Sequence, residues 1–139
     1  MQKPDLVVII KDKKNKQFTI RPAYKPKELA LFHDLLLSFN LHANFTEDHK
    51  FLLMFSPGNK QCGGIYWKII DEKTAHLEKI SIDEKYQGNG LGERLLNECL
   101  HRLKKNNIQH VTVSFMKSVF FQYHGFKTDA NFAGLVKKL

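Results

Sequence analysis

The spacing of hydrophobic and polar residues predicts two strands and one helix in the first third of the chain. β-forming side chains in residues 6–10 and 17–20 predict strands on either side of a lysine-rich turn. From residue 27 to about residue 39, apolar side chains recur at steps of three and four residues, as on one face of a helix. The polar stretch 40–49 has no such period, so we expect a short helix or a mobile loop there.

Three more strands are expected in the middle of the chain, paired in antiparallel order. The first, 51–55, is followed by Pro57 and Gly58, which suit the two central positions of a type II turn. A hairpin is therefore predicted, with its second strand over about 64–70. A further turn returns the chain into a third strand over 74–82.

A long amphipathic helix is predicted over 90–105, where leucines recur on one face. A strand over 111–115, a short helix over 118–123 and a final strand over 132–139 complete the pattern. This order of elements indicates an α+β fold with a mixed, mostly antiparallel sheet of about seven strands flanked by helices. Because the 139 residues contain no repeat, linker or break in composition, we expect a single domain.

Composition and charge narrow the classes of function. The apolar run 6–10 is too short for a membrane span or a signal peptide, so we expect a soluble, cytoplasmic protein without a membrane partner. Cys62 and Cys99 form no CxxC pair and should be buried, reduced thiols. The seven histidines lack a metal-ligand spacing, so no metal site is predicted. The net charge of +8 favours a polyanionic partner, which could be nucleic acid, an acidic membrane or a phosphate-rich small molecule. The alternative is that the lysines at 11, 13, 14 and 16 form a solvated turn and that those at 137 and 138 only flank a strand.

Three glycines, Gly88, Gly90 and Gly92, stand where the strand over 74–82 gives way to the long helix. Backbone N–H groups that no side chain covers, at the positive end of a helix dipole, are suited to bind phosphate. A P-loop is excluded because Gly92 is followed by Glu93 rather than by Lys and then Ser or Thr. A dinucleotide fingerprint is excluded because the spacing is GxGxG and the preceding elements are antiparallel hairpins.

The residues around these glycines resemble a known family. Residues 87–92 are similar to the pyrophosphate-binding pattern Gln/Arg-x-x-Gly-x-Gly/Ala of the GNAT superfamily of acyl-CoA-dependent N-acyltransferases. Residues 120–126 resemble the second signature of that family. The resemblance spans residues 17–139, whereas residues 1–16 fall outside it and are expected to be an extra strand or an extension.

The strand before the glycines carries a break in its alternation. Ile80 and Ile82 lie on one face, whereas Leu77 is three residues before Ile80 and is out of step. A β-bulge near Glu78 or Lys79 would restore the phase.

In the GNAT family this strand carries such a bulge and splays from the next strand, here the one near 110–115. The splay opens a slot in which the pantetheine arm of the coenzyme contacts the main chain. The resemblance therefore implies acetyl-CoA as a co-substrate. Its expected contacts are Ile80, Ser81, Ile82, Gln87, Gly88, Asn89, Gly90, Leu91, Gly92 and Phe121.

Acyl transfer from a thioester needs modest chemistry, because the thioester is already activated. The protein must hold an amine in line with the carbonyl group, remove a proton and stabilise the developing oxyanion. Glu78 is the carboxylate nearest the expected slot and is the candidate base. The alternative is a solvated glutamate paired with a neighbouring lysine.

The general acid departs from the family pattern. Many members carry a tyrosine four residues before the glycine at position 125, where its hydroxyl can protonate the leaving thiolate; this chain has Phe121 there. Tyr123 is another candidate acid. It comes two positions after Phe121, however, and on a helix this step turns its side chain about 200° away from that of Phe121. Ser114 and Ser118 are further alternatives. The thiolate could also leave unassisted, because a thiol pKa of about 8.5 makes it a fair leaving group.

The resemblance implies an enzyme, an N-acetyltransferase that moves the acyl group of acetyl-CoA to a primary amine by direct attack in a ternary complex. A non-catalytic acyl-CoA-binding or sensor domain and, less favoured, a basic nucleic-acid-binding module are the alternatives. The family recognises its acceptor through regions that correspond to 39–50 and 66–68 here. The acceptor and the oligomeric state, a homodimer included, stay open. Side chains that could line the acceptor pocket are His42, His49, Tyr66 and Trp67, although single aromatic residues at strand positions more often serve packing than recognition.

Overall fold

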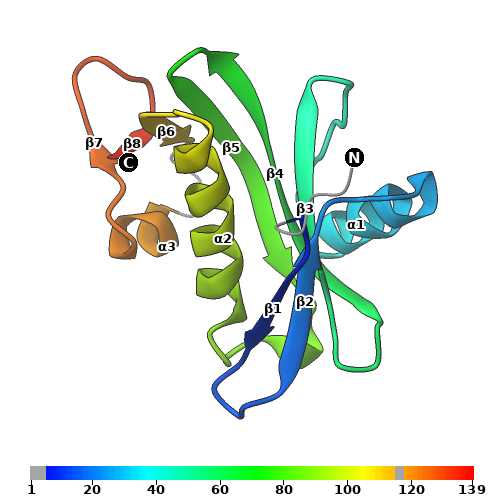
Figure 1. The fold of residues 1–139 in the computed structure, drawn as a ribbon. Helices are drawn as coiled ribbons and strands as arrows, with labels where there is room; N and C mark the ends of the chain where they lie inside the picture. Colours follow the sequence, from blue (N-terminus) through cyan, green and yellow to red (C-terminus); the bar gives the residue numbers. More distant parts are fainter. Residues whose placement is uncertain (1–5, 115–117) are drawn as a thin grey trace.

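A computed structural model describes residues 6–114 and 118–139, and an eight-stranded sheet runs through it (Figure 1). The strands are β1 (Val8–Lys11), β2 (Gln17–Arg21), β3 (His49–Phe55), β4 (Gln61–Asp71), β5 (Thr74–Ile82), β6 (His110–Val113), β7 (Lys127–Thr128) and β8 (Leu135–Lys138). Their order across the sheet is β1-β2-β3-β4-β5-β6-β8-β7. Neighbouring strands are antiparallel except β5 and β6, which run parallel.

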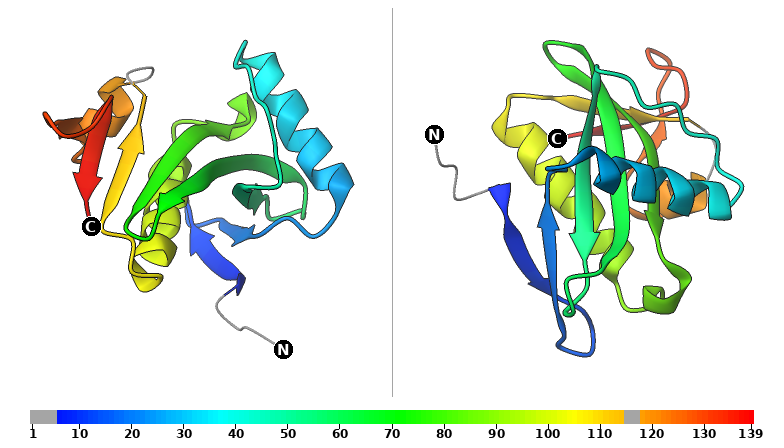
Figure 2. Two further views of the ribbon diagram at one scale, coloured as in Figure 1. Left: turned by 90° about the horizontal axis from the view of Figure 1, so that it is seen from above. Right: turned by 90° about the vertical axis from the view of Figure 1, so that its right-hand side faces the viewer.

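The helices of the described residues are α1 (Pro26–Ser38), α2 (Leu91–Lys105) and α3 (Ser118–Tyr123), with a 3-10 turn at Glu84–Tyr86. Helices α1 and α2 lie on opposite faces of the sheet, and α3 packs beside β8 (Figure 2). None of these helices combines the length and the apolarity needed to cross a bilayer. The predicted α+β class and the mixed, mostly antiparallel sheet are confirmed. The extension before residue 17 contributes β1, which pairs with β2 at the edge of the sheet.

The core on one face of the sheet is built around α2. Its leucines recur at the helical period, and Leu95, Leu96 and Leu103 are buried. They belong to the same apolar cluster as Ile65 of β4 and Val111 of β6. This packing holds the start of α2, and with it the glycine loop, beside the end of β5.

On the other face, Phe32 and Leu36 of α1 are completely buried against β3 and β4. Phe32 lies so close that a Cβ atom on Gly64 of β4 would stand 2.8 Å from its ring. The start of the helix is held by Glu28, whose Oε2 lies 2.6 Å from Nη2 of Arg21 on β2. The hydrogen bond from Arg21 lowers the pKa of Glu28 from an ordinary 4.5 to about 2.

The bulge predicted in β5 is present. Tyr66 of β4 pairs with Lys79 and Trp67 pairs with Leu77, so Glu78 is the extra residue. A bulge bends its strand and re-aims the side chain of the extra residue. The change of phase that the sequence indicates therefore centres on Glu78.

The parallel ladder between β5 and β6 joins Thr74–Leu77 to His110–Val113 and goes no further within the described residues. Near its end, Nδ1 of His76 lies 2.7 Å from Oγ1 of Thr112. The two strands are thus paired only up to the bulge. Phe115, predicted as part of the second strand, lies outside the described residues.

The connection between α1 and β3 is irregular, so the short helix considered for this segment does not form. The ring of Phe45 lies 4.8 Å from the rings of Phe51 and Tyr66, measured between centroids. A ring nitrogen of His33 on α1 lies 3.0 Å from the carbonyl oxygen of Ala43. This segment has no helical hydrogen bonds. Its contacts with the sheet and with α1 fix its position instead.

The hairpin between β3 and β4 is present, but the prediction of a type II turn is wrong. A type II turn needs a left-handed residue at Gly58. The left-handed residue of this turn is Asn59, with φ of 62°. Its N–H donates to the carbonyl oxygen of Ser56 at 2.8 Å. Asparagine tolerates this conformation, and Gly58 is not required to adopt it.

Both cysteines are buried, as predicted. Burial raises the pKa of the Cys62 thiol to about 12, and the charge of Asp83 adds to the shift. Burial also raises the pKa of Cys99, on the inner face of α2.

Candidate functional site

The glycine loop between β5 and α2 adopts a conformation that requires glycine. Gly88 and Gly90 have φ values of 86° and 82°, in the left-handed region where a side chain is strained. Gly90 is the N-cap of α2, so the unpaired N–H groups of the first helical turn border the loop. The side-chain amide of Gln87 donates to the carbonyl oxygen of Ile82 at 2.8 Å and ties the loop to β5. Such a helix start can bind an anion.

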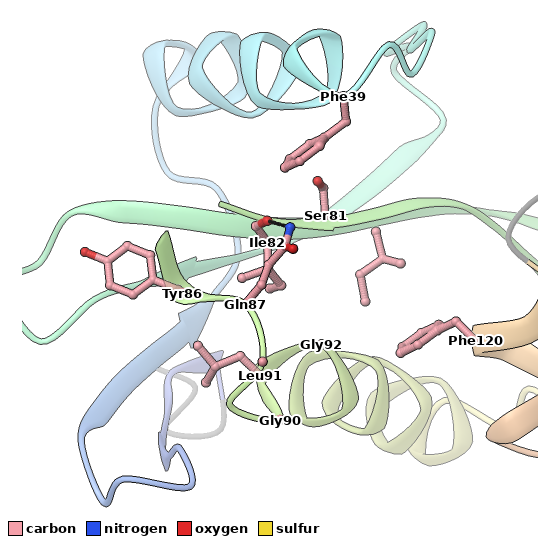
Figure 3. A pocket seen from close by; sticks show the side chains of 11 residues that line it. Phe39, Ser81, Ile82, Tyr86, Gln87, Gly90, Leu91, Gly92 and Phe120 are labelled. Atoms are coloured by element: carbon pink, nitrogen blue, oxygen red, sulfur yellow. Dashed lines mark hydrogen bonds between the residues drawn. The ribbon is translucent and has the colours of Figure 1, made fainter. Parts of the chain in front are cut away.

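A cavity of about 340 Å³ lies between the glycine loop, β5 and the start of α2 (Figure 3). Its lining is mostly apolar along β5, and the glycines stand at one end. This shape suits a long molecule that carries phosphate at one point along its length. The predicted coenzyme residues that line the cavity are Ile80, Ser81, Ile82, Gln87, Gly88, Gly90, Leu91 and Gly92.

Three aromatic residues that the sequence did not single out for this role also line the cavity: Phe39, Tyr86 and Phe120. The ring of Phe120 lies 3.8 Å from the position that a Cβ atom on Gly92 would take. The ring of Tyr86 meets that of Phe18 edge-on, with centroids 5.7 Å apart. Phe120 belongs to the second family signature and Tyr86 directly precedes the first, whereas Phe39 begins the segment 39–50 that was expected to recognise the acceptor.

The other two predicted coenzyme residues, Asn89 and Phe121, do not line this cavity. The main-chain oxygen of Asn89 accepts a hydrogen bond from the Lys13 N–H at 3.2 Å. Phe121 is buried, with its ring centroid 5.3 Å from that of Phe126. It lines a smaller cavity of about 20 Å³ near the bulge.

The small cavity lies where β5 and β6 stop pairing, and its walls include Glu78, Ile80, Val113 and Phe121. Ile80 also lines the 340 Å³ cavity. Glu78 also lines a third cavity, of about 390 Å³. The three cavities are therefore neighbours along β5, and Glu78 stands between the small one and the third.

The third cavity brings together the two regions expected to recognise the acceptor, 39–50 and 66–68. Trp67 is the exception: this side chain is buried in the core on the α2 face, so it serves packing and does not line the pocket. Successive residues of a strand point to opposite faces of the sheet, so Tyr66 and Trp67 cannot share a pocket. The lining residues are His42, Asn44, Thr46, Asp48, His49, Tyr66, Lys68, Glu78 and Lys79.

Glu78 is held by histidine rather than by lysine in the described structure. Oε2 of Glu78 lies 2.9 Å from Nε2 of His49 on β3. The other ring nitrogen of His49, Nδ1, accepts the N–H of Thr46 at 3.0 Å. Neutral His49 must then carry its proton on Nε2, where it donates to the carboxylate. The alternative of a solvated glutamate paired with lysine does not describe these contacts.

A second histidine stands on the other side of the carboxylate. Nε2 of His76 lies 3.8 Å from Oε1 of Glu78. Burial lowers the pKa of His76, and the charges of Lys68 and Lys79 lower it further, although Glu78 opposes them. His76 is therefore mostly neutral near pH 7. Burial, followed by the Glu78 charge, raises the pKa of the neighbouring Tyr66 hydroxyl.

Tyr123 is not brought to the candidate site. Its side chain is 83% exposed at the end of α3, and its ring contacts that of His124. The rotation of about 200° from Phe121 thus points it elsewhere. Ser114 lines the small cavity, whereas the side chain of Ser118 lies outside the description.

Within residues 6–114 and 118–139, no three His, Cys, Asp or Glu side chains are grouped so that they could hold a metal ion.

Comparisons with known proteins identify the family and the fold of the chain. The model of the acetyltransferase (GNAT) domain matches residues 20–133. Among curated proteins, none matches the chain.

The sheet and helices are also similar to those of solved structures. The GNAT domain of S. lividans PAT is 12% identical with a TM-score of 0.74, and all of both chains is covered. A GNAT-family acetyltransferase from Staphylococcus aureus Mu50 is 17% identical with a TM-score of 0.68, over 88% of this chain and 99% of that one. A GNAT acetyltransferase from Elizabethkingia anophelis with acetyl-CoA bound is 20% identical with a TM-score of 0.65, over 88% and 98%. The family match covers most of the sequence, and the protein therefore belongs to the GNAT acetyltransferase family.

Proposed function

We propose that the protein is an N-acetyltransferase that transfers the acetyl group of acetyl-CoA to a primary amine. The observation that carries this proposal is the position of Glu78. The carboxylate stands at the β5 bulge, between the small cavity beside Ile80 and the third cavity, which is lined with polar side chains. A group at this place can take a proton from an amine that approaches from the third cavity.

Acetyl-CoA fits the 340 Å³ cavity by the chemistry of its lining. Its diphosphate would lie at the N–H groups of residues 88–92, where the helix dipole favours negative charge. The pantetheine arm would run along Ile80, Ser81 and Ile82 towards the bulge. The thioester would then lie near the small cavity, with the acceptor amine on the Glu78 side.

In the proposed reaction the amine nitrogen attacks the thioester carbonyl carbon, the C–N bond forms and the C–S bond breaks. The proton lost by the amine passes to Oε1 of Glu78, because Oε2 is bonded to His49. The carboxylate later releases that proton to water. His49 acts through Glu78 and is a positioning residue.

The leaving thiolate receives no proton from Phe121, which has no polar atom. A coenzyme thiol with an ordinary pKa of about 8.5 leaves as thiolate and takes a proton from water. Phe121 also supports a second candidate function, a non-catalytic acyl-CoA-binding domain. Many members of the family carry a tyrosine at this position, and here it is replaced by phenylalanine.

Turnover separates the two functions. Purified protein is incubated with acetyl-CoA and pooled amines, amino acids and peptides, and acetylated products are detected by mass spectrometry. Thermal unfolding is measured in parallel, since acetyl-CoA at about a hundred times its dissociation constant should stabilise the fold by roughly 2.7 kcal/mol. Stabilisation without any acetylated amine would favour the binding domain, and no stabilisation at millimolar acetyl-CoA would contradict both.

A further inference from the structure

The lysine-rich turn between β1 and β2 is attached to the glycine loop. The N–H of Lys13 donates to the carbonyl oxygen of Asn89 at 3.2 Å. The Cε atom of Lys13 lies 3.5 Å from the place that a Cβ atom on Gly90 would take. Figure 3 shows the turn beside Gly90 at the start of α2, on the side away from β5. The turn, with the side chain of Lys13, therefore lies against the outer side of the loop.

The first turn of α2 makes a second attachment to the same hairpin. The guanidinium of Arg94 donates to the carbonyl oxygen of Lys11 from Nε at 3.3 Å and from Nη2 at 3.2 Å. Contacts from the loop and from the helix thus fix the β1–β2 hairpin beside the phosphate-binding N–H groups.

A basic cavity of about 470 Å³ lies on this outer side. Four lysines line it: Lys14, Lys16, Lys60 and Lys85. Asp12 also lines it. Its Oδ1 accepts hydrogen bonds from the main-chain N–H groups of Lys14 and Lys16, both at 2.9 Å, and these bonds stabilise the turn. Tyr86 lines both this basic cavity and the 340 Å³ cavity, so the two adjoin at the 3-10 turn before the loop.

The hairpin turn lies outside the part of the chain that the family model matches. The GNAT domain model begins at residue 20, after β1 and the turn. The four lysines of the basic cavity thus include two, Lys14 and Lys16, that the family match does not cover.

We propose that the basic cavity is a second phosphate subsite, which takes the 3′-phosphate at the nucleotide end of coenzyme A. This inference rests on the proposed function. With the diphosphate at the glycine loop and the sulfur end along β5, the nucleotide must leave the loop outside the 340 Å³ cavity. The adjoining space in the described structure is lined by four lysines against the single carboxylate of Asp12, and ammonium is a good point-charge partner for phosphate.

The test compares coenzyme A with dephospho-coenzyme A, which lacks only the 3′-phosphate. Dissociation constants are measured by titration calorimetry for the wild type, a Lys14→Gln/Lys16→Gln variant and a Lys104→Gln control. Lys104 is exposed in the last turn of α2, about 20 Å from the loop by helix length.

We expect the wild type to bind coenzyme A about five- to twentyfold more tightly than dephospho-coenzyme A, since each exposed charge pair contributes a few-fold. The double variant should bind dephospho-coenzyme A as the wild type does and should lose most of the preference. The control variant should keep the preference. Raising the salt concentration to 1 M should shrink the preference of the wild type, because exposed charges are then screened.

Two other results have distinct meanings. If the wild type binds coenzyme A but shows no preference, or if the double variant keeps the preference, the second subsite is refuted and the proposed function stands. If the wild type binds neither coenzyme, the proposed function fails and the inference fails with it. Equal melting temperatures of the unliganded variants would exclude misfolding as the cause of any loss.

Discussion

Nε2 of His49 lies 2.9 Å from Oε2 of Glu78, so a residue of β3 holds the carboxylate that stands at the bulge of β5. The N–H of Thr46 occupies the other ring nitrogen and leaves Nε2 as the donor. One oxygen of Glu78 is thereby engaged. The other, Oε1, lies 3.8 Å from His76 and is the better placed to receive a proton.

Glu78→Gln should lower turnover at neutral pH by roughly ten- to ten-thousandfold, because an amide cannot accept the amine proton. The dissociation constant of acetyl-CoA should change little, since Glu78 does not line the 340 Å³ cavity. Steady-state rates and calorimetric titration measure the two effects. Glu72→Gln, in the exposed turn between β4 and β5, is the control. Undiminished turnover in Glu78→Gln would assign the proton to another group or to water.

His49→Ala should lower kcat by about ten- to a hundredfold, because the loss of its hydrogen bond lets Glu78 leave its position. His49→Gln should recover part of the rate, since its side-chain amide can donate to the carboxylate. Both variants should bind acetyl-CoA normally. If alanine and glutamine reduce kcat equally, the contact of the ring with Tyr66, at 5.0 Å between centroids, matters more than the hydrogen bond.

Phe121→Tyr should leave turnover unchanged, because the thiolate is already a competent leaving group. The added hydroxyl should lower the free energy of unfolding by about 1 to 3 kcal/mol if it is buried without a partner. Rates and urea unfolding test both expectations. Tyr123→Phe, at an exposed position, should change neither quantity. A clear rise in rate for Phe121→Tyr would show that departure of the thiolate limits the reaction.

Glu28→Gln should destabilise the protein at pH 7 by about 1 to 3 kcal/mol, because Arg21 loses its charged partner. The pKa of Glu28 is about 2 in the folded protein and 4.5 ordinarily, so its contribution is present above pH 4.5. It is lost as the pH falls towards 2. Urea unfolding of the wild type and the variant should therefore converge between pH 5 and pH 2. Asp34→Asn, exposed on the same helix, should show no such convergence.

Local patterns predicted much of the fold. The bounds of β5 follow from alternating side chains between turns, and those of α2 from leucines at the helical period. The bulge could be predicted from the phase difference between Leu77 and Ile80, because alternation along a strand is visible in the sequence. β7 has two residues and depends on pairing with β8, so no local pattern indicates it.

Tertiary contacts could not be predicted in the same way. His49 and Glu78 are 29 residues apart and meet because β3 and β5 flank β4. Phe120 and Phe121 are equally apolar, and a six-residue helix is too short for a period to show which of them faces which cavity. Whether Trp67 packs in the core or lines a pocket could not be decided from the sequence, because β4 is buried on both faces there and hydrophobicity alone does not distinguish them.

The burial of Cys62 and Cys99 has a consequence for a protein that handles thioesters. Exchange with a thioester requires a thiolate, and burial raises the pKa of Cys62 to about 12 and that of Cys99 as well. The two thiols stay protonated and out of reach near neutral pH, so the folded chain does not take up the acetyl group on its own sulfur. A colorimetric thiol reagent added to the folded protein would accordingly count released coenzyme without a background from the enzyme.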